Sequence, residues 1–277
     1  MFKKMKLRMA LIYFGLIALS IFSLLPFAWM ISTSFKNLSE TFNTPVNWIP
    51  KVFTMESYKN IWTIQNFGVY FKNSAIAASF STLFSVILAA LAGYGFSRFR
   101  FKYGKSLMVF VLVSQMFPGI LLVIPYFSMT SKMGLINSYT ALIIAYTSFS
   151  LPFCLWMLKG FFDSIPIQLD EAAMVDGCSR LKTFFHIILP VSLPGIAATV
   201  IFAFLQAWNE FLFALVLTTT PKMYTMTVGI ANNIGQFRIQ WNDLMAASVV
   251  ATLPTIILYS FLEKYLVQGL TAGAVKG

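Results

Sequence analysis

The stretch that decides the fold is residues 159–190, which read KGFFDSIPIQLDEAAMVDGCSRLKTFFHIILP. It lies between two long runs without charged residues, Met133–Leu158 and Ile187–Asn209. A helix needs about 20 apolar residues to cross the hydrocarbon core of a bilayer, and both runs meet that length. A charged loop between two such runs predicts a membrane protein with this loop on one side of the bilayer.

Working outward from this loop, four more charge-free runs are long enough to span: Met9–Phe35, Asn73–Ser97, Ser106–Ser131 and Leu244–Leu262. The sequence therefore predicts an all-α membrane protein, a single transmembrane domain over 1–277. Its six spans are expected at about 10–31, 74–97, 106–127, 139–158, 193–217 and 244–262. The first run follows a basic start like that of a signal peptide. It is too long and lacks a cleavage site, so we expect an uncleaved helix.

The composition excludes several classes of protein. Only 10% of the residues are charged and 58% are hydrophobic, whereas soluble domains have about 25% charged residues. A soluble enzyme and a disordered chain are thereby excluded. The net charge of +11 does not indicate nucleic-acid binding, because basic loops at a membrane surface account for it.

The distribution of Lys and Arg predicts the orientation. With the N-terminus inside, 13 of the 20 Lys and Arg fall in inside segments, as the positive-inside rule requires. The basic cluster 98–105 contributes most. Both termini are therefore expected in the cytoplasm, where the environment is reducing and Cys154 and Cys178 should not form a disulfide.

Little catalytic chemistry is present. Gly104-Lys105-Ser106 resembles the end of a phosphate-binding loop, but Phe99 stands where that motif needs Gly. The single histidine, His186, and two cysteines do not form a metal site. Ion-coupled carriers usually have several acids in their spans, and here only Glu210 qualifies. An ion-coupled secondary carrier is thus disfavoured but stays open.

Local signals predict two short helices in the loop 159–190. Ser164 is placed to cap the first helix, and Gly177 to end it. Ser179 is placed to cap a second helix that runs to His186. Several apolar residues of the first helix would face water, which favours a partner protein.

The loop also resembles a known family. Glu171-Ala172-Ala173, then Gly177, then Ile187 and finally Leu189-Pro190 match the complete EAA signature of permeases of binding-protein-dependent ABC importers. Residues 207–211 (AWNEF) and 269–277 (GLTAGAVKG) resemble the carbohydrate, maltose-type branch. The length resembles the six-span member of its permease pair.

The resemblance implies a type I ABC importer permease fold in a bacterial cytoplasmic (inner) membrane. It implies that Glu171, Ala172, Ala173, Asp176 and Gly177 couple the chain to an ATPase. The implied partners are a second permease, two ATPase subunits that bind the ATP, an extracytoplasmic solute-binding protein and a sugar, with no cofactor or metal on this chain. Two alternatives stay open: a non-sugar solute such as glycerol phosphate or a polyamine, and a loop helix that rests on lipid headgroups.

Polar residues inside the spans are candidates for the solute path. Gln206, Asn209 and Glu210 are spaced to share one face of a helix, and an acid in the membrane should face protein or water. Gln115 precedes Pro118, which should kink the third span. A purely structural role stays open for each of them.

Two further segments are candidates for contacts with partners. Residues 218–243 are long enough to touch the binding protein, although packing on the helices is an alternative. The resemblance implies that the C-terminal tail 269–277 reaches toward the ATPases.

Overall fold

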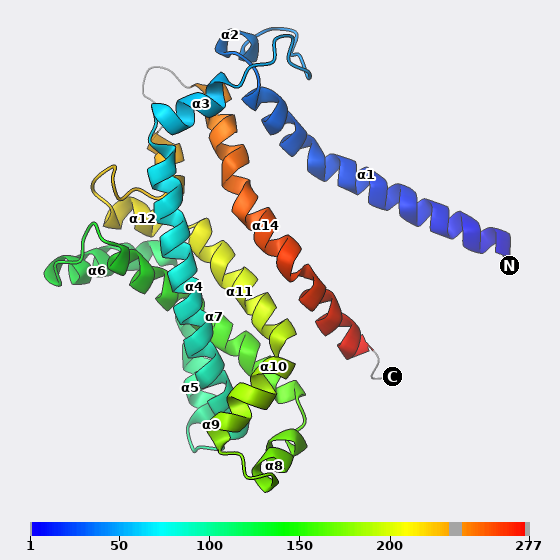
Figure 1. Cartoon of the computed structure of the whole chain (residues 1–277), viewed down its shortest axis with the longest axis vertical. Helices are drawn as coiled ribbons and strands as arrows, with labels where there is room; N and C mark the ends of the chain where they lie inside the picture. Colours follow the sequence, from blue (N-terminus) through cyan, green and yellow to red (C-terminus); the bar gives the residue numbers. More distant parts are fainter. Residues whose placement is uncertain (1, 233–239, 275–277) are drawn as a thin grey trace. The chain divides into compact units, whose positions relative to one another are not determined.

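The computed structural model describes the backbone of residues 2–232 and 240–274, and the side chains of 8–232 and 240–265. Within these ranges every regular element is a helix (Figure 1). The chain divides into two compact units. One comprises Met1–Gly68 with Ile230–Leu253, and the other Val69–Gly229 with Pro254–Gly277. Parts of both expected partner contacts, residues 233–239 and 275–277, lie outside the described residues.

The first unit begins with a long apolar helix, α1 (Phe2–Ser34). In its most apolar window no residue is buried against the rest of the chain. A helix that is apolar all round is typical of a membrane span, and the expected first span, 10–31, lies within α1. Its surface is available to lipid or to another chain.

The segment after α1 folds around a buried lysine. Lys36 is 1% exposed, and its ammonium group donates to the carbonyl of Asn47 at 2.6 Å. It also lies 3.9 Å from the ring centroid of Trp29, a cation–π contact. Burial lowers the pKa of Lys36, and nearby Glu40 opposes this shift.

Two short helices, α2 (Leu38–Thr41) and α3 (Glu56–Thr63), complete this segment. The long helix α14 (Trp241–Ala274) begins in the first unit and ends in the second. At its start Asn242 donates to the hydroxyl of Ser57 at 3.0 Å. This bond joins α14 to α3.

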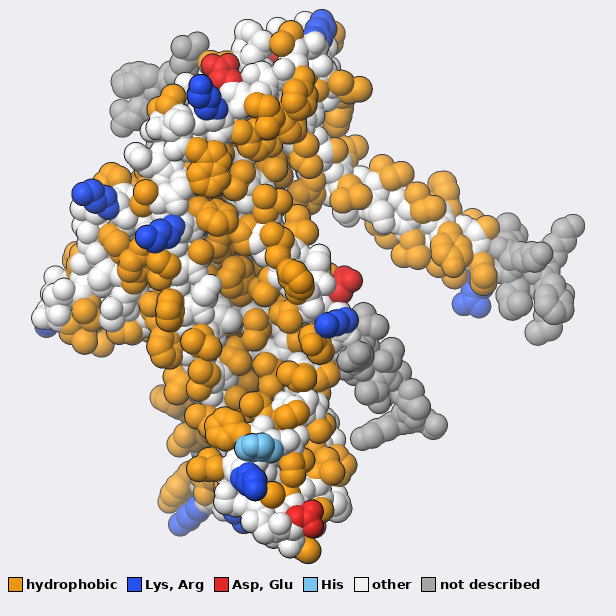
Figure 2. All heavy atoms as spheres, in the orientation of Figure 1, with side chains coloured by type: hydrophobic (Ala, Val, Ile, Leu, Met, Phe, Trp, Pro, Cys, Tyr) orange, Lys and Arg blue, Asp and Glu red, His pale blue; other side chains and the backbone are white. Residues whose placement is uncertain are grey.

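The second unit contains most of the remaining helices. In chain order they are α4 (Phe67–Arg98), α5 (Gly104–Val113), η1 (Ser114–Met116), α6 (Gly119–Lys132), α7 (Tyr139–Ser164), α8 (Gln168–Val175), α9 (Arg180–Thr183), η2 (Phe184–Ile188), α10 (Leu189–Val191), α11 (Leu193–Trp208), α12 (Leu212–Leu217) and α13 (Met226–Asn232). α7 packs mainly against α11 and also contacts α5 and α12. Figure 2 shows apolar side chains over most of the face in view and few charged ones.

The core of the second unit lies where α4, α5, α7, η2 and α11 meet. It is built from Ala89, Ala90, Tyr94, Met108, Cys154, Leu155, Leu158, Phe162, Phe184, Ile188 and Ala203. A Cβ at Gly93 would lie 3.1 Å from the backbone nitrogen of Lys159. Glycine therefore lets α4 lie close to the backbone of α7.

Four helices are long and apolar enough to cross a membrane, and two bent pairs raise the number to as many as six among the described residues. The expected third span, 106–127, is divided: α5 with η1 and α6 meet at 97°. The break falls at Phe117, whose backbone is extended, because the residue before a proline is disfavoured in a helix. The expected kink at Pro118 is thus a complete break.

Candidate functional site

The loop 159–190 starts later than the sequence indicates. α7 continues through Ser164, so the expectation that Ser164 caps the next helix is wrong. Its hydroxyl instead donates to the carbonyl of Phe161 at 2.7 Å. The extended backbone required before Pro166 ends α7 at Ile165, and α8 begins at Gln168 without a side-chain cap.

The helix α8 has two different faces. Asp170 and Ala173 are buried, whereas Glu171, Ala172 and Asp176 are exposed. Successive residues of a helix point about 100° apart. Asp170 can therefore face the protein interior while its neighbour Glu171 faces outward. Three of the predicted coupling residues therefore lie on one short helix, with Glu171 and Ala172 outward and Ala173 inward, and Asp176 and Gly177 follow directly at its end.

Gly177 ends α8, as the sequence indicates. Its φ is +81°, a left-handed conformation that glycine adopts without strain. The amide of Gly177 donates to the carbonyl of Met174 at 3.1 Å, and the amide of Cys178 to that of Ala173 at 2.9 Å. These bonds close the end of the helix and set the bend.

The second short helix is also present. The hydroxyl of Ser179 accepts from the amide of Lys182, which confirms the expected cap. The helix does not end at His186 but continues through η2 and α10 to Val191. It meets α11 at 79°, at the two prolines Pro190 and Pro194.

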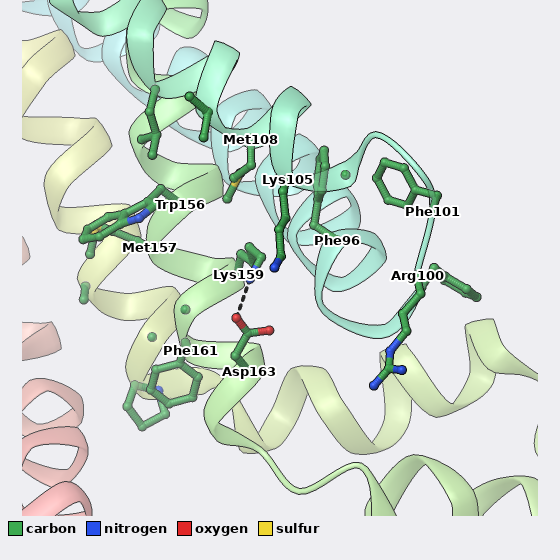
Figure 3. A pocket seen from close by; sticks show the side chains of 18 of the residues that line it. Phe96, Arg100, Phe101, Lys105, Met108, Trp156, Met157, Lys159, Phe161 and Asp163 are labelled. Atoms are coloured by element: carbon green, nitrogen blue, oxygen red, sulfur yellow. Dashed lines mark hydrogen bonds and ion pairs between the residues drawn. The ribbon is translucent and has the colours of Figure 1, made fainter.

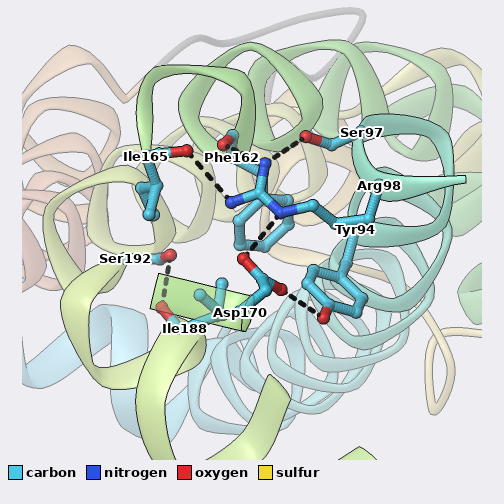
Figure 4. Close-up of polar contacts among 8 residues, drawn as sticks. All are labelled: Tyr94, Ser97, Arg98, Phe162, Ile165, Asp170, Ile188 and Ser192. Atoms are coloured by element: carbon cyan, nitrogen blue, oxygen red, sulfur yellow. Dashed lines mark hydrogen bonds and ion pairs between the residues drawn. The ribbon is translucent and has the colours of Figure 1, made fainter. Parts of the chain in front are cut away.

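A buried ion pair attaches α8 to the rest of the unit (Figure 4). One oxygen of Asp170 accepts from the hydroxyl of Tyr94 at 2.6 Å. The other accepts from Nε of Arg98 at 2.9 Å, and the side chains of Arg98 and Asp170 are 5% and 7% exposed. Arg98 also donates to the carbonyls of Phe162 at 3.0 Å and Ile165 at 3.1 Å.

Sequence reasoning missed this cluster. The basic cluster 98–105, which includes Arg98, was used only to predict the orientation in the membrane, and no partner was predicted for Asp170. A signal was available, because Asp170 and Glu171 are adjacent on a short helix and only one of them can face outward. Arg98, which pairs with Asp170, lies 72 positions earlier in the chain, and no local sequence pattern identifies it as the partner.

The expected polar stripe in the fifth span is not a single helix face. α11 ends at Trp208, so Asn209 and Glu210 lie beyond it, and the helical spacing argument is wrong there. Glu210 instead caps α12: its carboxylate accepts from the amides of Phe213 at 2.8 Å and Ala214 at 3.0 Å. A carboxylate that accepts two free amides at a helix start is a stable arrangement.

Three of the four predicted path residues still meet at one cavity of about 280 Å³. Gln115, Gln206 and Glu210 line it, at the breaks between η1 and α6 and between α11 and α12. The amide of Gln115 donates to the carbonyl of Phe149 at 2.9 Å. Asn209 is not among the lining residues, and its amide donates to the carbonyl of Leu205 at 2.9 Å.

A second cavity, of about 1370 Å³, was not predicted. Its lining is mainly apolar and includes Phe96, Phe101, Trp156 and Phe161, with cations at Arg100, Lys105 and Lys159. Figure 3 shows Lys159 paired with Asp163 and Lys105 directed toward this pair.

The described residues contain no cluster of three or more metal-ligating side chains. Cys154 and Cys178 are both free thiols. The described residues thus offer a short helix with an exposed face and a polar cavity at two helix breaks.

Comparison with known proteins identifies the fold and the family. Residues 81–272 match the family described as the binding-protein-dependent transport system inner membrane component. The chain is 42% identical over 274 residues to the trehalose/maltose transport system permease protein MalG of Thermococcus litoralis, covering 98% of both chains. It is 34% identical over 252 residues to the diacetylchitobiose uptake system permease protein DasC of Streptomyces coelicolor, covering 91% of both.

Among solved structures, the chain resembles a bacterial ABC transporter involved in the import of the acidic polysaccharide alginate. The TM-score is 0.82 at 19% identity, over 94% of this chain and 96% of that one. The predicted fold class, the all-α type I ABC importer permease, is thereby confirmed. Since the family match covers most of the sequence and the relatives share this identity, the chain belongs to the binding-protein-dependent transport system inner membrane components.

Proposed function

We propose that this chain is a permease subunit of an ATP-driven ABC importer for oligosaccharides or disaccharides. The observation that carries the proposal is α8, whose outward face presents Glu171 and Ala172 at a bend fixed by Gly177. Relatives named for trehalose/maltose and for diacetylchitobiose support a sugar as the solute.

The proposed partners are a second permease, two ATPase subunits and an extracytoplasmic solute-binding protein. The family description supports a binding-protein partner and an inner-membrane location. The loop at Gly104 lacks the glycine that a phosphate-binding loop requires, which supports binding of the ATP by the ATPase subunits rather than by this chain. The Lys and Arg distribution supports a cytoplasmic position for both termini.

In this proposal the outward face of α8 is the coupling surface. ATPase closure moves α8, and the helices of the second unit then change from inward-open to outward-open. Exposed apolar side chains next to Glu171 support a protein interface: Val175 is 87% and Met174 39% exposed. Asp176 and Gly177 contribute the end of the helix and its bend.

The cavity lined by Gln115, Gln206 and Glu210 is the proposed part of the solute path on this chain. Its amide and carboxylate groups are the hydrogen-bond partners that sugar hydroxyls require. Asn209 was predicted to lie beside these residues on a continuous helix, but it does not line the cavity. Its side chain is exposed, and Asn209 would contact the solute only outside this cavity.

Reversal of the charge at Glu171 tests the proposal. The transporter is assembled with its partner permease, ATPases and binding protein, and capture of the ATPase and sugar uptake are measured. We expect Glu171→Lys to abolish both while the permease still inserts in the membrane.

The matched control is Glu56→Lys, the same charge reversal at an exposed residue of α3 in the first unit. It should leave ATPase capture unchanged. Normal capture and uptake by Glu171→Lys would overturn the coupling surface.

A further inference from the structure

Arg98 connects three elements through one guanidinium group. It belongs to the end of α4, donates through Nε to Asp170 of α8, and donates through Nη1 and Nη2 to carbonyls at the end of α7. Nη1 also donates to the hydroxyl of Ser97 at 3.1 Å. Its planar fork of donors fits such fixed partners better than a lysine.

Tyr94 strengthens the same junction. Its hydroxyl donates to Asp170, and its ring lies 4.9 Å from that of Phe184 in η2 and 6.1 Å from that of Phe162 in α7, centroid to centroid. One element before α8 in the chain, α7, and one after it, η2, therefore contact the end of α4.

The attachment of α8 to α4 depends on this one carboxylate. α8 packs mainly against α9 and η2 of its own loop. Among the described side chains, those of α8 make hydrogen bonds to α4 only through Asp170. A movement of α8 must therefore carry the end of α4 with it or separate a buried ion pair, and separation leaves an unpaired charge in a buried place.

We propose that Tyr94, Arg98 and Asp170 form a joint that transmits the movement of α8 to α4 and α7. They act as positioning residues for coupling, since Asp170 faces away from the outward surface that Glu171 occupies. The inference rests on the proposed function, because it assigns the transmission step behind the coupling surface.

The test compares two adjacent acids in the complete transporter. Asp170→Asn keeps the size of the side chain and removes its charge, whereas Glu171→Lys alters the outward face. The readouts are ATPase capture, ATP hydrolysis, and sugar uptake per ATP hydrolysed. We expect Asp170→Asn to capture the ATPase normally and to hydrolyse ATP. Its uptake per ATP should fall by at least about tenfold, because the variant loses a charge-assisted hydrogen bond and leaves the buried Arg98 without its counter-charge.

Tyr94→Phe is the second variant, because it keeps both charges and removes a single hydrogen bond. It should give a smaller loss of uptake per ATP with normal capture. Wild-type coupling in both variants would overturn the joint. So would a loss of uptake that only follows a loss of assembled complex, since the cluster would then serve stability alone.

The two proposals fail in different ways. If Glu171→Lys still captures the ATPase and supports uptake, the proposed function fails. If that variant loses capture while Asp170→Asn and Tyr94→Phe couple normally, the coupling surface stands and the joint alone is refuted.

Discussion

Substitution of Gly177 should destabilise the bend that follows α8, and the conformation of Gly177 sets the free-energy cost. An added Cβ at Gly177 meets no atom within 4 Å, so Gly177→Ala brings no clash. Its cost is the left-handed conformation at φ +81°, which is about 1–2 kcal/mol for an L-residue with a Cβ. If this cost destabilises the bent conformation of the loop, the fraction of molecules with the bend in place falls by about 5- to 30-fold.

Other residues at this position should follow the same reasoning. Gly177→Asn should cost less, because asparagine tolerates the left-handed region. Gly177→Pro should cost about 3 kcal/mol or more, because proline fixes φ near −65° and removes the amide that donates to Met174.

The assay is the affinity of the assembled permease pair for the ATPase, measured by titration in detergent or nanodiscs. The matched control is Gly134→Ala, since Gly134 also has a positive φ of +68° and open space around it. It carries the same strain in a turn outside the loop and should leave the affinity unchanged. The reasoning is refuted if Gly177→Ala binds the ATPase like wild type, or if alanine and asparagine have equal effects.

Three further predictions concern Gly195, Glu210 and Asn137. In Gly195→Ala the Cβ would lie 2.5 Å from the ring of Phe161. Overpacking of about 1–3 kcal/mol should therefore lower the melting temperature in detergent, whereas Gly160→Ala, with open space, should not. Glu210→Leu removes the cap of α12 and should lower the free energy of unfolding by about 1 kcal/mol. Glu210→Gln keeps a side-chain acceptor for the cap. A loss of uptake in Glu210→Gln without a loss of stability would therefore indicate that Glu210 contacts the solute. Asn137→Ala removes the oxygen that accepts from the amides of residues 219 and 220, and should increase hydrogen exchange there.

Several features of the fold follow from local sequence signals. The long charge-free runs predict the four long apolar helices α1, α4, α7 and α14, because length and apolarity are local properties. The bend at Gly177 and the cap at Ser179 were predicted for the same reason, since each depends on one residue and its neighbours along the chain.

Features that depend on distant partners were not predicted. The contact between Arg98 and Asp170 joins two helices far apart in sequence, and both residues have plausible roles by themselves. The role of Glu210 was predicted on the wrong geometry, because the pattern of residues 193–217 does not reveal that α11 stops at Trp208. The sequence also did not predict that the helix ends completely before Pro118, because a proline is compatible with both a kink and a break.

In the proposed function, this chain imports its solute only when a docked ATPase hydrolyses ATP. The most direct test is sugar uptake into proteoliposomes that contain the permease pair and the binding protein, with and without the ATPase. We predict uptake that requires both the ATPase and ATP, with none under an ion gradient alone. Uptake driven by an ion gradient in the absence of the ATPase would contradict it.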